Sequence, residues 1–228
     1  VVSESLDNAG EIESGELWIT SNIGINTGQL SALETAKFNV ESMMNAGTLN
    51  AKIVSLEGSV FSNSGIVFGE ERLSMALTEQ LLNQETGVLQ SDSRLMFTGD
   101  QLQNNGLIQA QQLSLSADGI TNNSRIVGNS LILAGGRLAN QGIISAGLLT
   151  ANHTLMTNSG AMFADEMSLH SDGFFNVGDI SARNGAEVIS RTLENSGTLN
   201  ATTLRLLGDS LLNSGAILAQ ALLEISMT

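Results

Sequence analysis

The chain has 228 residues, no cysteine, no proline and a formal net charge of −14. The absence of cysteine excludes a disulfide framework and a thiolate metal site, and the acidic balance argues against nucleic acid, whose binding depends on basic residues that neutralise phosphates. No apolar run is long enough to cross a membrane and no signal peptide is visible at Val1, so we expect any export signal to lie outside this segment.

An asparagine returns every 18 to 21 residues along the whole chain. The twelve anchors are Asn8, Asn26, Asn45, Asn63, Asn83, Asn104, Asn122, Asn140, Asn158, Asn176, Asn195 and Asn213. Glycine stands two places after ten of them, Glu85 and Ser124 being the exceptions. A fixed period indicates a solenoid, in which each copy buries its apolar face against its neighbours. We predict one repeat domain over residues 1–228, cut from a longer filament because no capping unit is evident at either end.

Each copy follows the pattern Leu-x-Asn-x-Gly-x-Ile-x-Ala, in which apolar residues alternate with others. Alternation with period two predicts strands, and a copy is too short for a strand–helix–strand unit. We therefore predict an all-β solenoid of about twelve coils of 18–21 residues, stacked in parallel about 4.8 Å apart. Asparagine fits a corner because it tolerates left-handed φ, and stacked amides can form a ladder. Glycine would allow a tight path where a Cβ would clash.

A leucine-rich repeat is the architectural alternative, because it also stacks asparagines. Its unit carries Leu-x-x-Leu-x-Leu ahead of the asparagine and needs about 20 to 29 residues. Strict alternation on both sides of the anchor and a period of mostly 18 residues disfavour it.

The first copy is acidic and contains no base. Its acids are Glu4, Asp7, Glu11, Glu13 and Glu16. Such a run is typical of a solvated face, and a calcium site would need a loop signature that is missing.

Copies four and five are stretched, and their extra length falls within Glu70–Leu82 and Gln84–Ser93. The spacing of Leu73, Leu77 and Leu81 would suit a short amphipathic helix, but the surrounding period favours a strand with a bulged corner. An enlarged corner can serve as a binding loop, and a neutral insertion is the alternative.

Positions three and five after the anchor are expected to point outward, and in copies four to nine they become apolar. These residues are Ile66, Phe68, Val88, Leu107, Val127, Ile143 and Phe163. An exposed apolar stripe often marks an interaction site, so we predict a receptor-contact surface here. The alternatives are a covering loop of the same chain or simple β-propensity at tolerant positions.

Signals for catalysis are weak. Many parallel β-helices are polysaccharide lyases or hydrolases, so a carbohydrate-active enzyme is the alternative function, by analogy of fold. Asp165, Glu166 and Asp179 are one conceivable acid cluster, without a recognisable motif. His153 and His170 could lie in adjacent coils, but two histidines alone make a weak metal site, and we expect surface residues without a role. We predict no catalytic residue, metal or cofactor.

The repeat unit resembles the haemagglutinin repeat of filamentous haemagglutinin and of the large effectors of contact-dependent growth inhibition. Clear instances are Leu102–Ala110, Leu138–Ala146 and Leu193–Ala201. The resemblance covers nearly the whole chain and implies a right-handed parallel β-helix, secreted by two-partner secretion in Gram-negative bacteria and displayed on, or shed from, the cell surface. The secretion domain of such proteins carries Asn-Pro motifs and a toxin domain is not repetitive, so the resemblance points to the shaft.

From this we expect a non-catalytic, structural or adhesive segment of a virulence-associated exoprotein. Its expected partners are an outer-membrane transporter for secretion of the full protein and an outer-membrane protein or glycan receptor on a target cell. The expected location is the bacterial cell surface or the medium.

Overall fold

The computed structural model describes every residue from Val1 to Thr228, and all its regular elements are β-strands. The chain divides into two units, Val1–Ala117 and Asp118–Thr228. The first unit holds β1 (Ser5–Asn8), β2 (Glu11–Asn26), β3 (Gln29–Asn45), β4 (Thr48–Asn63), β5 (Ile66–Asn83) and β6 (Val88–Asn104). β7 (Leu107–Asn122) begins in the first unit and ends in the second. The second unit holds β8 (Arg125–Asn140), β9 (Ile143–Asn158), β10 (Ala161–Asn176), β11 (Asp179–Asn195), β12 (Thr198–Gly208), β13 (Ser210–Asn213) and β14 (Ala216–Met227). No helix long and apolar enough to cross a membrane is present.

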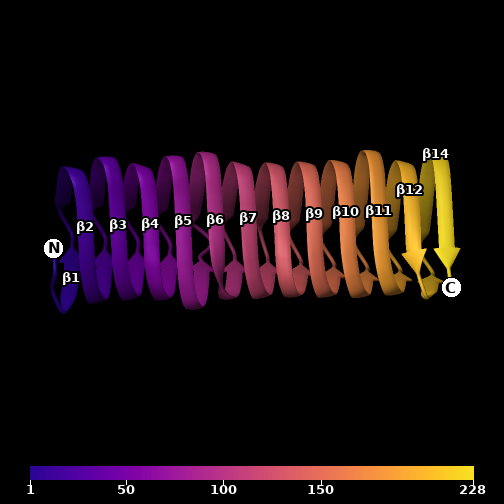
Figure 1. Ribbon diagram of the computed structural model, residues 1–228, viewed down its shortest axis with the longest axis horizontal. Helices are drawn as coiled ribbons and strands as arrows, with labels where there is room; N and C mark the ends of the chain where they lie inside the picture. Colours follow the sequence, from indigo (N-terminus) through magenta and orange to yellow (C-terminus); the bar gives the residue numbers. More distant parts are fainter. The chain divides into compact units, whose positions relative to one another are not determined.

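Within each unit, successive coils pair in parallel, so that equivalent residues of the repeat lie side by side (Figure 1). Asn26 of β2, for example, is in register with Asn45 of β3, and Asn158 of β9 with Asn176 of β10. The prediction of an all-β parallel solenoid of about twelve coils is therefore confirmed. Strand residues fill nearly the whole of each coil between successive anchors, and this excludes the leucine-rich repeat, whose coil joins one strand to a helical segment.

The core consists of columns of inward-facing apolar side chains. Four places after the anchor, fully buried residues are Leu30, Leu49, Val67 and Ile108 in the first unit and Ile126, Ile144 and Met162 in the second. Phe38, Phe61 and Phe97 add bulk to the first unit and Phe174 to the second. Because neighbours on a strand point to opposite faces, Phe174 is buried while Phe175 is half-exposed.

The corner at each Asn-x-Gly is tight without being left-handed. No residue other than glycine has a positive φ, so the left-handed φ that we expected at the asparagines is wrong. The side-chain amides of the asparagines bond the backbone carbonyls of the corner, while the backbone itself keeps an ordinary conformation. The glycines are needed for space: a Cβ on Gly47 would overlap the carbonyl oxygen of Gly28 in the preceding coil.

The stretched coils contain strand rather than helix. β5 runs unbroken from Ile66 to Asn83, as the alternation favoured. Relative to β4 it gains one residue between Gly69 and Arg72 and another between Leu77 and Gln80, at register shifts typical of bulges. In the next coil the extra residues lie in the corner itself, between Asn83 and Gly87.

Candidate functional site

The anchor asparagines form a ladder of side-chain hydrogen bonds in each unit. In the first unit, Nδ2 of each asparagine from Asn8 to Asn83 donates to Oδ1 of the next, at 2.8, 2.7, 2.8, 3.0 and 2.9 Å. In the second unit, the same bonds from Asn122 to Asn213 measure 2.8, 2.7, 2.8, 2.7 and 2.8 Å. All of these residues except Asn213 are buried.

The remaining polar atoms of the corner are also satisfied within the protein. Nδ2 of Asn45 lies 3.2 Å from the carbonyl oxygen of Gly47 and 3.3 Å from that of Ile66. The backbone carbonyl of Asn45 accepts from the N–H groups of Ser64 and Gly65, at 2.8 and 3.1 Å. An amide has two hydrogens, and here both point at protein acceptors, so the ladder has none left for a ligand. Its geometry is that of a structural element.

In the first unit, three of the outward apolar residues form one column. Ile66 is in register with Val88, and Leu107 follows, its N–H donating to Gly87 at 2.9 Å. Ile66 is 46% exposed, and Val88 and Leu107 are half-exposed. Phe68 lies in the parallel column, where its partners are Asn50 and Gln90. This group, which we call the first apolar patch, therefore consists of three aliphatic residues with one phenyl ring beside them.

In the second unit no two of the predicted contact residues are neighbours within a column. Ile143 is 40% exposed and lies between Arg125 and Ala161 in its column. Val127 and Phe163, the latter 42% exposed, lie in the other column on either side of Ser145. Positions three and five after the anchor are distinct columns, so the residues of the predicted contact surface do not lie in a single row. We call Val127, Ile143 and Phe163 the second apolar patch.

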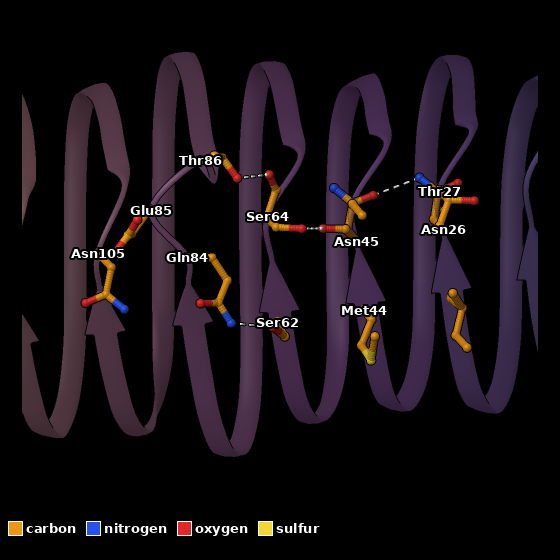
Figure 2. A pocket seen from close by; sticks show the side chains of 12 residues that line it. Asn26, Thr27, Met44, Asn45, Ser62, Ser64, Gln84, Glu85, Thr86 and Asn105 are labelled. Atoms are coloured by element: carbon orange, nitrogen blue, oxygen red, sulfur yellow. Dashed lines mark hydrogen bonds between the residues drawn. The ribbon is translucent and has the colours of Figure 1, made fainter.

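The inserted corner Gln84–Gly87 forms a hollow on the first unit (Figure 2). It closes on itself through a bond from the N–H of Gly87 to the carbonyl of Gln84, at 2.9 Å. The side chains turn back toward the preceding coil: Gln84 Nε2 donates to Ser62 Oγ at 3.3 Å, and Thr86 Oγ1 donates to the carbonyl of Ser64 at 2.7 Å. The hollow has a volume of about 490 Å³. The sequence predicts the enlarged corner that forms one wall of the hollow. It does not predict that the hollow extends over the coils of β2 to β6.

The conceivable acid cluster is not assembled. Asp179 starts β11 and is in register with Ala161, four residues before Asp165. Asp165 is paired with Arg183 at 2.9 Å, and the Glu166 carboxylate lies over Gly185. The three carboxylates thus do not face one reaction centre, as a glycosidase would need. In the first copy, all five acids are exposed.

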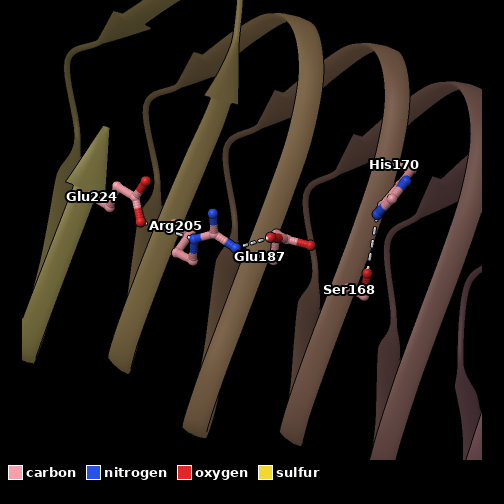
Figure 3. A network of polar contacts seen from close by, with 5 residues as sticks. All are labelled: Ser168, His170, Glu187, Arg205 and Glu224. Atoms are coloured by element: carbon pink, nitrogen blue, oxygen red, sulfur yellow. Dashed lines mark hydrogen bonds and ion pairs between the residues drawn. The ribbon is translucent and has the colours of Figure 1, made fainter. Parts of the chain in front are cut away.

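Further along the second unit, Arg205 bridges two carboxylates of adjacent coils (Figure 3). Its Nη1 lies 2.6 Å from Glu187 and its Nε lies 2.9 Å from Glu224. The hydrogen bond and charge of Glu224, followed by the charge of Glu187, raise the pKa of the guanidinium. All three side chains are exposed to solvent to a substantial degree, so the cluster reads as surface pairing between coils.

The two histidines lie on opposite faces and form no shared site. His170 is in register with Asn152 and accepts or donates a bond with Ser168 Oγ at 3.2 Å, as Figure 3 shows. His153 is 2% exposed, in register with Gly135, and neither ring nitrogen has a hydrogen-bond partner. The expectation of a surface residue is therefore wrong for His153. Burial lowers its pKa to about 4.

These features define the class of protein as a parallel β-solenoid with an internal asparagine ladder in each unit. The chain is 29% identical over 102 residues to part of the tRNA nuclease CdiA of Yersinia mollaretii, a match that covers 45% of this chain and 3% of that protein. It is 28% identical over 132 residues to part of the deoxyribonuclease CdiA of Dickeya dadantii, covering 56% of this chain and 4% of that protein. The chain thus spans only a small part of the length of the curated relatives it matches. No protein-family model and no solved structure matches it.

Proposed function

We propose that this chain is a non-catalytic shaft segment of a large secreted exoprotein of the CdiA kind, exposed at the bacterial cell surface. The observation that supports this most is the register: equivalent residues pair from coil to coil, and a buried amide ladder links the coils in each unit. Such a stack gives stiffness and length. The similarity to small parts of two very long CdiA proteins agrees with a repeated segment.

The nuclease activities for which the relatives are named belong, in this proposal, to regions other than the matched 3–4% of their length. The residues here support that assignment, because the acids are separate or ion-paired and the anchor amides are engaged. The full protein would reach the surface through an outer-membrane transporter, by two-partner secretion.

The segment also contacts a target cell in this proposal. The first and second apolar patches are its contact residues, since apolar side chains exposed in neighbouring coils favour interaction with a partner. The partner is an outer-membrane protein or glycan receptor on that cell, as in contact-dependent growth inhibition.

Replacing Phe68, Ile143 and Phe163 with serine in the full-length protein tests the contact role. We expect binding to target cells to fall by about tenfold or more, because a few apolar anchors dominate most interfaces. The matched control replaces Leu33, Leu148 and Val177 with serine, all exposed and outside the patches. Unchanged binding by the folded Phe68, Ile143 and Phe163 variant would remove the contact role and leave the shaft.

A further inference from the structure

The hollow lies beside the corner at which the repeat is longer than its regular form. In the other corners, one residue lies between the anchor asparagine and the glycine, or in one case serine, that follows it. Three residues lie between Asn83 and Gly87. The two additional residues, Glu85 and Thr86, are exposed, and Thr86 is held against Ser64 of the preceding coil. The insertion thereby forms a wall above a floor of regular corners (Figure 2).

The side chains that line the hollow are uncharged, with one exception. Hydroxyls and amides of Thr27, Ser62, Ser64, Gln84 and Thr86 line it, together with the exposed thioether of Met44. Glu85 is the one charged side chain of the lining, and no lysine or arginine takes part. An anionic ligand would thus meet a carboxylate with no cation to balance it.

The backbone of the floor is not available to a peptide strand. The N–H groups of Thr27, Ala46 and Ser64 donate to asparagine carbonyls of the preceding coil at 2.8, 2.7 and 2.8 Å. Peptides that add to a sheet need free main-chain donors and acceptors at an edge. Here recognition has to go through side chains.

These side chains favour a ligand rich in hydroxyl donors. Thr86 Oγ1 gives its hydrogen to a backbone carbonyl and keeps lone pairs for an incoming donor, and the Glu85 carboxylate accepts only. Met44, which is 56% exposed, and the half-buried Ile25 offer an apolar surface for C–H groups. The volume of about 490 Å³ is within the roughly 300–1,000 Å³ of small-ligand sites.

We propose that the hollow beside Gln84–Thr86 is a binding site for a neutral glycan, whose hydroxyls bond the side chains of the corner and whose C–H face packs on Met44. No aromatic ring lines the hollow, so binding takes place without the contribution of aromatic stacking. The site is separate from the two apolar patches. It does not depend on their role in target-cell contact.

The test is a nuclear magnetic resonance titration of the ¹⁵N-labelled 228-residue chain with maltohexaose and, separately, with chitotetraose. We expect saturable shift changes at Thr27, Ser64 and Gln84–Thr86 with at least one of the two, little altered by salt because no charge pairing is involved. A sulfated heparin hexasaccharide and a hexalysine peptide serve as charged probes. Absence of saturable changes with both neutral probes, or stronger binding of either charged probe at this corner, would overturn the proposal.

Two variants sharpen the result. Deleting Glu85 and Thr86 restores the spacing of the regular corners, and we expect it to weaken binding by about tenfold or more, because several hydrogen bonds are lost together. If that variant does not fold, Thr27→Val removes one exposed hydroxyl at constant shape, with an expected loss of about threefold. Ser159→Ala, at the equivalent place beside a regular corner, should leave binding unchanged. Equal affinity of the folded deletion variant and the wild type would contradict the site, whatever the outcome for the apolar patches.

Discussion

Nδ2 of Asn140 donates to Oδ1 of Asn158 across 2.7 Å, and both side chains are buried. The same amide lies 3.2 Å from the carbonyl of Gly142 and 3.1 Å from that of Ala161, so one side chain joins two coils and closes its own corner.

Replacing Asn140 with alanine should therefore be costly. It removes the acceptor of Asn122 and the donor to Asn158, and leaves buried polar groups unpaired. We expect a loss of about 2–4 kcal/mol in the free energy of unfolding, measured by urea denaturation followed by circular dichroism. Asn152→Ala, at an exposed position, should cost less than about 0.5 kcal/mol. Similar losses for both variants would contradict the structural role of the ladder.

The corner glycines should tolerate alanine only where no coil crowds them. In Gly47→Ala the new Cβ meets the carbonyl oxygen of Gly28, a backbone atom that cannot swing away, so we expect a cost of about 3 kcal/mol or more. Gly10→Ala occupies the same place in the repeat with nothing within 4 Å of the Cβ, and should be nearly neutral. Thermal unfolding of the two variants side by side checks this, and equal melting temperatures would refute the steric explanation.

His153 should make the second unit sensitive to acid. The ordinary pKa of histidine is 6.5, and burial lowers that of His153 to about 4, so the unfolded chain binds a proton more readily than the folded one between these values. Stability contributed by neutral His153 is complete above pH 6.5 and decreases as the pH falls toward 4, by up to roughly 3 kcal/mol. The measurement is the unfolding free energy as a function of pH.

A change of pH acts on other groups as well, so the comparison has to be between variants. Valine is a suitable replacement for His153 because Val40 is buried at the equivalent position of the repeat in the first unit. The His153→Val variant should show a flatter pH dependence of the unfolding free energy between pH 4 and 6.5. Asn152→Ala, at the exposed position next to His153, should keep the wild-type slope. A His153→Val variant with an unchanged slope would rule out the buried imidazole as its origin.

The two neighbouring phenylalanines of β10 provide a test of the inward and outward faces. Phe174 is fully buried, and its replacement by alanine should cost about 3–5 kcal/mol through lost burial and a cavity. Phe175 faces outward and is half-exposed, so Phe175→Ala should cost about 1 kcal/mol. Chemical denaturation distinguishes the two, and a reversed order would mean that the strand presents its other face to the core.

The coils could be predicted well from the sequence because the repeat occurs twelve times and the alternation within strands identifies the inward-facing positions. His153 was missed although the signal was present: it continues the alternation of Leu149 and Ala151, both buried. The positions of Arg125 and Ser145 among the apolar residues could also have been predicted from the sequence, by treating positions three and five after the anchor as two separate columns. The direction in which Gln84 and Thr86 turn was not, because it depends on contacts with Ser62 and Ser64 that no periodicity encodes.

Each bond between asparagine side chains in the two ladders runs from the NH₂ group of one asparagine to the oxygen of the asparagine that comes later in the chain, as from Asn26 to Asn45 and from Asn176 to Asn195. The stack in each unit therefore has a polarity, with donors facing one way and acceptors the other. A coil added in the reverse sense would bring two oxygens or two NH₂ groups together. Growth by head-to-head addition is thus disfavoured, and only coils laid down in the same sense as the chain continue the pattern.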